Sequence, residues 1–150
     1  MPACRVLATN HTAFTVSDLD RALAFYSNVL GFSVSAKVRH SGAMAETVTG
    51  VPGAELDIAF VDTPGHKIEL MQYLKPIDKR RSDLRPCDPG FTHIAFEVDN
   101  IDAIVAAVEA EGFRIISPPQ TVLAGPRKGG KTVYTRDPDG IVIEFQQAAA

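Results

Sequence analysis

The sequence predicts an α+β fold in which two tandem βαβββ modules form a cupped mixed sheet. The main observation behind this prediction is an internal repeat. The residues that start at His11 match those that start at His93, 82 positions later, and a Gly-Phe pair recurs at Gly31 and Gly112, 81 positions later. So small a drift is typical of a duplicated structural unit. Two further observations support the fold: strand-like alternation of apolar and polar residues, and a glycine after each helical segment.

Each copy is expected to run strand, helix and then three strands. Apolar residues recur at helical spacing from Leu19 to Tyr26 and from Ile101 to Val108. Gly31 and Gly112 follow these segments, where a left-handed C-cap residue is needed. The expected N-caps and the aspartates three residues after them, which would form weak capping boxes, are Ser17 with Asp20 and Asp99 with Asp102.

The later strands are expected near residues 32–38, 55–62 and 67–73 in the first copy, and near 113–116, 131–136 and 141–146 in the second. Asp137 to Gly140 is a good β-turn sequence between the last two strands. The segment His40–Ala54 is rich in glycine and small residues and is expected to be a mobile loop. The prediction is therefore one domain, with modules at about 5–74 and 90–147 and a linker at about 75–89.

Composition restricts the classes of function. The formal net charge is −3, so no long-range field attracts nucleic acid. The first residues contain no long apolar run, which argues against a signal peptide or membrane span. Two cysteines do not make a disulfide framework, and a cytoplasmic protein is expected. The basic stretch Lys75–Arg85 is interpreted as a solvated linker, with an anchor for an anionic substrate tail as the alternative.

Alternation along the strands separates an apolar face from a face with one potential metal ligand. In the strand after the linker, for example, Ile94 and Phe96 share one face and His93 points the other way. The polar residues that lie opposite an apolar face in four strands are His11, Glu69, His93 and Glu144. Each copy thus contributes one His followed by one Glu. Two imidazoles and two carboxylates suit a divalent first-row metal such as Zn, Ni, Co, Mn or Fe, with positions left for a substrate with neighbouring oxygens.

These residues and the motifs around them resemble the vicinal-oxygen-chelate superfamily, also known as the glyoxalase/bleomycin resistance/dioxygenase family. The motifs are His11 with Val16-x-Asp18-Leu19, Ile68-Glu69-Leu70, His93 to Asp99, and Asp137-Pro138-Asp139-Gly140 with Glu144. The resemblance covers nearly the whole chain. It implies paired βαβββ modules around a metal held by His11, Glu69, His93 and Glu144. This ligand set is most similar to those of glyoxalase I and the methylmalonyl-CoA epimerases.

The leading hypothesis is a lyase or isomerase of the glyoxalase I type. Gly125 to Thr132 resembles a loop of bacterial glyoxalase I. Two positions depart from the groups that hold glutathione in that family: Thr15 stands in place of an arginine, and Gln72-Tyr73 stand where an asparagine is found. The alternative is an epimerase of the methylmalonyl-CoA type, with Asp57 as a candidate second acid. A ring-cleaving (extradiol) dioxygenase using His11, His93 and Glu144, or a non-catalytic binding or resistance protein, are further alternatives.

The expected chemistry of the first two hypotheses is the same. The metal acts as a Lewis acid, and Glu144 or Glu69 removes a proton next to a carbonyl to give an enediolate. The expected partner is a small-molecule substrate with vicinal oxygens, and the resemblance implies a homodimer.

Overall fold

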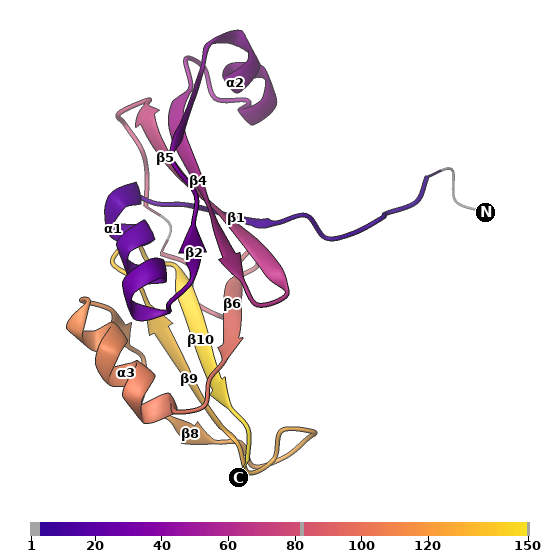
Figure 1. Ribbon diagram of the computed structural model, residues 1–150, viewed down its shortest axis with the longest axis vertical. Coiled ribbons are helices and arrows are strands. Elements are labelled where there is room, and N and C mark those ends of the chain that lie inside the picture. The colour runs from indigo at the N-terminus through magenta and orange to yellow at the C-terminus, as the bar shows by residue number, and fades with distance from the viewer. Residues whose placement is uncertain (1–3, 82, 150) are drawn as a thin grey trace. The chain divides into compact units, whose positions relative to one another are not determined.

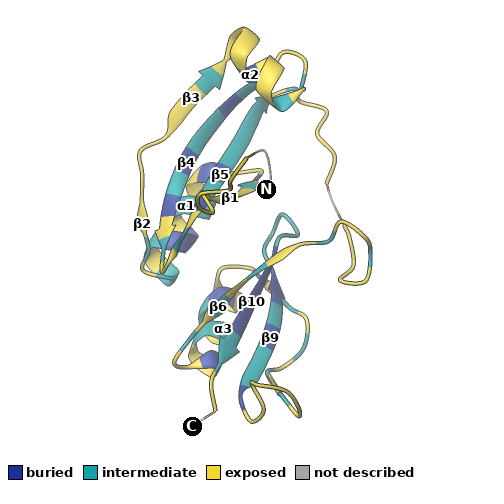
Figure 2. Cartoon of the chain, turned by 90° about the vertical axis from the view of Figure 1, so that its right-hand side faces the viewer, coloured by how far each residue is buried: buried dark blue, intermediate teal, exposed yellow. Residues whose placement is uncertain are grey.

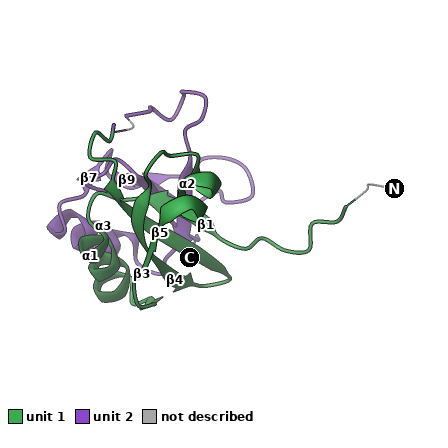
Figure 3. Ribbon diagram, turned by 90° about the horizontal axis from the view of Figure 1, so that it is seen from above, with its two compact units in different colours: residues 1–79 green, residues 80–150 purple. Residues whose placement is uncertain are grey.

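The computed structural model describes residues 4–81 and 83–149. The chain divides into two compact units, Met1–Lys79 and Arg80–Ala150 (Figure 3). The division falls inside the segment predicted as a linker. Each unit is described by itself below.

The first unit holds one five-stranded mixed sheet and two α-helices. Its order is β1 (Thr12–Thr15), α1 (Leu19–Ala24) continued by a π-helical turn (Phe25–Val29), β2 (Ser33–Val34), β3 (Val38–Ser41), α2 (Gly42–Thr49), β4 (Glu55–Thr63) and β5 (His66–Lys75). The strand order is β1-β5-β4-β2, and β3 also pairs with β4. Only β1 and β5 run parallel; the other pairs are antiparallel.

The second unit repeats this arrangement. Its order is β6 (His93–Glu97), α3 (Ile101–Ala110), β7 (Arg114–Ile115), β8 (Gln120–Thr121), β9 (Lys131–Arg136) and β10 (Val142–Gln147). The strand order is β6-β10-β9-β7, with β8 also on β9, and only β6 and β10 are parallel. Because β2 with β3, and β7 with β8, each share the place of one interrupted strand, both units are βαβββ modules. The predicted α+β class is confirmed.

Helices α1 and α3 each pack on the apolar face of their own sheet. In the first unit, α1 contacts β5 and β4, and completely buried residues such as Leu19, Val61 and Ile68 lie on this side. In the second, α3 contacts β10, where Phe145 is 0% exposed. Figure 2 shows the buried residues concentrated on β4, β9 and β10. No helix in the described part of the chain has the length and apolar character needed to cross a membrane.

Both helices begin one residue later than the sequence suggested. The N-caps are Asp18 and Asn100, whose side chains accept from the backbone N–H groups of Arg21 and Ala103 at 3.0 Å. The prediction of Ser17 and Asp99 as N-caps was therefore wrong. The reason lies in the next residues: Leu19 and Ile101 are completely buried, and their N–H groups donate to Gln72 Oε1 at 2.9 Å and Gln147 Oε1 at 2.8 Å. These contacts fix them as the first helical residues. The predicted capping-box partners bind lysines instead, Asp20 to Lys37 and Asp102 to Lys131.

The helix ends are as predicted. Gly31 follows the π-helical turn with φ 71°, and Gly112 follows α3 with φ 81°. Both conformations lie in the left-handed region, where a side chain would be strained. The predicted turn from Asp137 is also confirmed, since the N–H of Gly140 donates to the carbonyl of Asp137 at 3.0 Å.

The segment His40–Ala54 is not the loop that was predicted. It holds the end of β3 and the helix α2, which is packed at one end of β4 and β5 (Figure 1). Ala45 of α2 forms a small core with Ala54 and Leu56, and Met71 and Tyr73 pack against it. Small residues suggested flexibility, but here alanine lets the helix lie close to the sheet, and Gly50 ends the helix with φ 66°.

The cap assignment gives a direct stability test. Replacing Asn100 with Ala should lower the free energy of unfolding by about 0.5–2 kcal/mol, because the N–H of Ala103 loses its acceptor. Replacing the neighbouring exposed Asp99 with Ala should change it by less than about 0.5 kcal/mol. Urea unfolding followed by circular dichroism measures both. Equal losses in the two variants would contradict the assignment.

Candidate metal centre

The predicted ligands are brought together in pairs by the parallel strands. In the first unit Ala13 of β1 pairs with Glu69 of β5, and in the second Ala95 of β6 pairs with Glu144 of β10. His11 and His93 each precede that alanine by two residues, so they share its face. The same register therefore places one imidazole beside one carboxylate in both units. Among the described residues, each unit gathers two groups of metal-binding type and not three.

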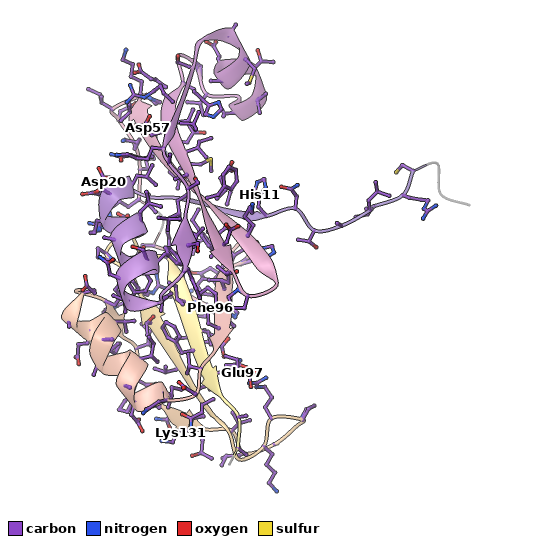
Figure 4. The ribbon with its side chains drawn as sticks, viewed as in Figure 1. His11, Asp20, Asp57, Phe96, Glu97 and Lys131 are labelled. Carbon is purple, nitrogen blue, oxygen red and sulfur yellow. The ribbon has the colours of Figure 1, made fainter. Side chains whose placement is uncertain are left out.

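In the first unit, His11 Nε2 lies 3.4 Å from Glu69 Oε2. The other ring nitrogen, Nδ1, is 2.6 Å from the Oδ1 atom of Asn10. Because a carbonyl oxygen only accepts, Nδ1 donates in this contact, and Nε2 is the ring nitrogen that faces the carboxylate. His11 lies where the N-terminal segment leads into β1 (Figure 4). Its ring makes a T-shaped contact with the ring of Phe60, with centroids 6.0 Å apart.

In the second unit, His93 Nε2 lies 3.0 Å from Glu144 Oε2. Glu144 is the more enclosed carboxylate and is 8% exposed. Its Oε1 atom accepts two hydrogen bonds of 2.6 Å, from the hydroxyl of Thr132 and from the amide Nε2 of Gln146. The ring of His93 packs on that of Tyr134, with centroids 5.1 Å apart. Burial, and then the charge of Glu144, raise the pKa of Tyr134, so its phenol stays protonated at neutral pH.

Sequence reasoning missed Thr132, Tyr134 and Gln146. A signal for them was present, because residues two apart in a strand share a face. Gln146 lies two residues after Glu144, and Thr132 and Tyr134 alternate in the correctly predicted strand β9. The pairing of Tyr134 with Glu144 and of Thr132 with Gln146 then completes the cluster. That pairing register could not be read without the structure.

Asp57, the candidate second acid, lies elsewhere. It pairs with Gln72, which binds the start of α1, whereas Phe60 is the residue that pairs with Glu69. Figure 4 shows Asp57 on the side of the first unit where Asp20 and α1 lie. Arg39 binds Asp57 through two nitrogens, and these hydrogen bonds hold the pKa of the carboxyl below its usual value. Asp57 is the ion-pair partner of Arg39 and not an acid on the ligand face.

The two pairs fit a divalent cation. Nitrogen and oxygen ligands at about 2.0–2.2 Å from one ion, about 90° apart, lie roughly 3 Å from each other. The measured Nε2 to Oε2 distances are 3.4 Å and 3.0 Å. The donor set of imidazole and carboxylate suits first-row metals.

The sequence matches one family model over most of its length. Residues 8–145 match the Glyoxalase/Bleomycin resistance protein/Dioxygenase superfamily. The chain belongs to this superfamily. Similar proteins include a 2-epi-5-epi-valiolone epimerase from an Actinomyces species, 32% identical over 93% of this chain and 78% of its own length. A lactoylglutathione lyase from Haemophilus influenzae is 33% identical over 90% and 88%. Human mitochondrial methylmalonyl-CoA epimerase is 32% identical over 93% and 73%.

Solved structures show the same fold. A glyoxalase family protein from Bacillus cereus superposes with a TM-score of 0.84 at 24% identity, covering 100% of this chain and 99% of the other. The fosfomycin resistance protein FosX of Listeria monocytogenes, solved in complex with Mn(II) and sulfate, gives a TM-score of 0.63 at 17% identity over 97% and 95%. A protein whose crystal structure contains Mn(II) thus shares this fold.

Removal of either imidazole should remove the metal. If His11, Glu69, His93 and Glu144 are the ligands, as predicted, His11→Ala and His93→Ala should each lose most of the bound divalent metal, because each unit offers only two groups of metal-binding type among its described residues. The fold should persist, since both imidazoles are 33% exposed and neither belongs to the buried core. Elemental analysis after gel filtration gives the stoichiometry, and circular dichroism controls for folding. Full metal content in the His93→Ala protein would contradict the assignment. His66→Ala serves as the matched control, because His66 is not one of the predicted metal ligands.

Proposed function

We propose that this protein is a divalent-metal-dependent lyase or isomerase of the glyoxalase I type, which moves a proton at a carbon next to a carbonyl. The observation that carries the proposal is the repeated pair: the same strand register sets a His Nε2 against a Glu Oε2 in both units. His11, Glu69, His93 and Glu144 are the residues proposed to hold the metal. Relatives named as lyases and epimerases support an enzyme rather than a passive binder.

When bound, the metal supplies Lewis-acid chemistry: it polarises a substrate carbonyl and makes the neighbouring C–H acidic. The chain supplies the rest. Asn10 orients the imidazole of His11 by a hydrogen bond. Tyr134 packs on the imidazole of His93. A carboxylate, Glu69 or Glu144, accepts the proton and returns it to the same or a neighbouring carbon. The aromatic rings of Phe60 and Tyr134 lie beside His11 and His93.

An epimerase is the second candidate. The similar proteins named above include a 2-epi-5-epi-valiolone epimerase and a methylmalonyl-CoA epimerase. Thr15 and Gln72 also stand where the glyoxalase I enzymes hold glutathione, and Gln72 is engaged with the N–H of Leu19. These observations favour a substrate other than a glutathione adduct while the proton-transfer chemistry is unchanged. The homodimer and the cytoplasmic location, expected from sequence, stay predictions.

The proposed chemistry needs no oxygen. Under anaerobic conditions in deuterated water, the metal-loaded protein should be incubated with the hemithioacetal of methylglyoxal and glutathione, an α-hydroxyketone and methylmalonyl-CoA. Turnover with deuterium at the reacting carbon, or with internal return of the proton, is expected by mass spectrometry. The apoprotein is the control. Strict dependence on oxygen, with ring opening of a catechol, would refute the proposal and make His11, His93 and Glu144 an iron triad.

A further inference from the structure

We propose that the first unit carries a subsite for an uncharged, apolar substituent of the substrate, formed by Val38, Ile58 and Met71 and closed by helix α2. These three residues are called the apolar row below. The inference rests on the proposed function and deepens it, because it names the substrate class. That class is a compact carbonyl compound with a short alkyl or ring group next to the oxygens that the metal chelates.

The apolar row lies on the same face of the sheet as the predicted metal ligand Glu69. Val38 of β3 pairs with Ile58 of β4, and Ile58 pairs with Met71 of β5. Met71 follows Glu69 by two residues, so the row shares its face and lies about 7 Å farther along the strand. Phe60, which pairs with Glu69, is also apolar. The apolar surface therefore begins directly beside the predicted ligand.

The side chains of this surface are open to contact. Val38 is 55% exposed, and Ile58, Phe60 and Met71 are only partly buried. On the opposite face of β4, by contrast, Val61 is completely buried under α1. Burying an apolar group against such a surface strengthens binding by up to about 4-fold for each methylene. The row offers this gain to the part of a substrate that lies beside the metal ligands.

Helix α2 closes this surface at the end away from Glu69. Leu56 precedes Ile58 by two residues and so lies on the same face, and Ala45 of α2 packs on it. Leu56 is only 2% exposed, so the accessible surface ends there. Figure 1 shows α2 at this end of β4 and β5. The open length from Glu69 is then about 7 Å, roughly that of a five-carbon chain.

The second unit has a polar row in the same place. This row consists of Gln146, Thr132 and Gln120, which pair with one another across β10, β9 and β8 as the apolar row does across β5, β4 and β3. Residues 122–130, which join β8 to β9 as α2 joins β3 to β4, contain no helix. A βαβββ module therefore forms without an apolar row or a helix on this face. Both features of the first unit are free to serve binding.

The test uses hydroxamates, which chelate a metal through two oxygens and differ here only in their chains. Binding to the Co(II)-loaded protein should be titrated by visible absorption. Hexanohydroxamate should bind at least about 10-fold more tightly than acetohydroxamate, because its longer chain reaches the apolar row. Octanohydroxamate should gain less than about 2-fold more, because α2 closes the surface. Adipic monohydroxamate, as long as hexanohydroxamate but with a charged end, should lose the gain.

Variants that copy the second unit test the row itself. Val38→Gln and Ile58→Thr should each lower the affinity ratio of hexanohydroxamate to acetohydroxamate by at least about 3-fold, because each replaces apolar contact area with a polar group. Val34→Gln is the matched control, since Val34 is 39% exposed and pairs with Val61 on the opposite face. Thermal melting verifies folding. Because Val38 is exposed on a strand that pairs only with β4, its variant keeps the test decisive if Ile58→Thr unfolds.

Hydrogen exchange tests the role of α2 without any substitution. In the wild-type protein, exchange in residues 42–54 should slow more with hexanohydroxamate than with acetohydroxamate at saturation, because only the longer chain reaches the cluster that holds α2.

The outcomes separate this inference from the proposed function. A flat affinity series, or equal ratios for Val38→Gln and Val34→Gln, would overturn the subsite, while Co(II) and acetohydroxamate binding would leave the metal proposal standing. A continued gain with octanohydroxamate, or unchanged exchange in residues 42–54, would overturn the closure by α2. A wild-type protein that binds no Co(II) would overturn the proposed function and this inference together.

Discussion

The candidate site depends on the parallel pairing of the first and last strand in each module. Parallel neighbours need a long crossover connection, and here the helix and three intervening strands supply it. Once β5 lies beside β1 and β10 beside β6, the register sets Ala13 against Glu69 and Ala95 against Glu144. A shift of one residue would turn each glutamate to the helix side of its sheet. The apolar face enforces the register, because Ile68, Leu70, Ile143 and Phe145 are all buried.

A second contact ties each helix to the strand that bears the glutamate. Gln72 and Gln147 each follow the glutamate of their unit by three residues, so they point to the opposite face. There they accept from the N–H of Leu19 and Ile101, the first residues of α1 and α3. The helix start, whose N–H groups lack partners within the helix, is thereby bound to the same strand as the ligand. These contacts therefore link the packing on the core face of each sheet to the position of the glutamate on its ligand face.

Much of this architecture could be predicted because duplication and alternation are local signals. The repeat offset, strand β9 and the left-handed Gly31 and Gly112 came from residue type and spacing alone. The predicted N-caps were one residue too early. Ser17 and Asp18 are both residue types that cap helices well, and the burial of Leu19 determines that Asp18 is the N-cap. The helix α2 was missed because its packing on Leu56 is a tertiary contact that small residues do not reveal.

The candidate site, like the fold, could be predicted from the sequence only in part. Alternation identified the four ligand candidates, since face is a property of a single strand. The residues that surround Glu144 required the pairing of β9 with β10, because Thr132 reaches Glu144 only across the sheet. The difference between the two units follows from this: a duplicated backbone keeps the strand register, while its neighbouring side chains change independently. Ile58 and Thr132, at equivalent places, are the plainest case.

The structural contacts of Gln72 and Tyr73 limit which residues could bind a substrate tail. Gln72 is committed to the start of α1, and Tyr73 packs against the small core of Ala45, Ala54 and Leu56 under α2. Neither side chain is free to bind glutathione without loss of a structural contact. Thr15, by contrast, shares its face with Ala13 and is exposed, yet it carries no charge for a carboxylate. Within the proposed function, these contacts favour a substrate other than a glutathione adduct, because none of the three positions offers an unengaged charged group.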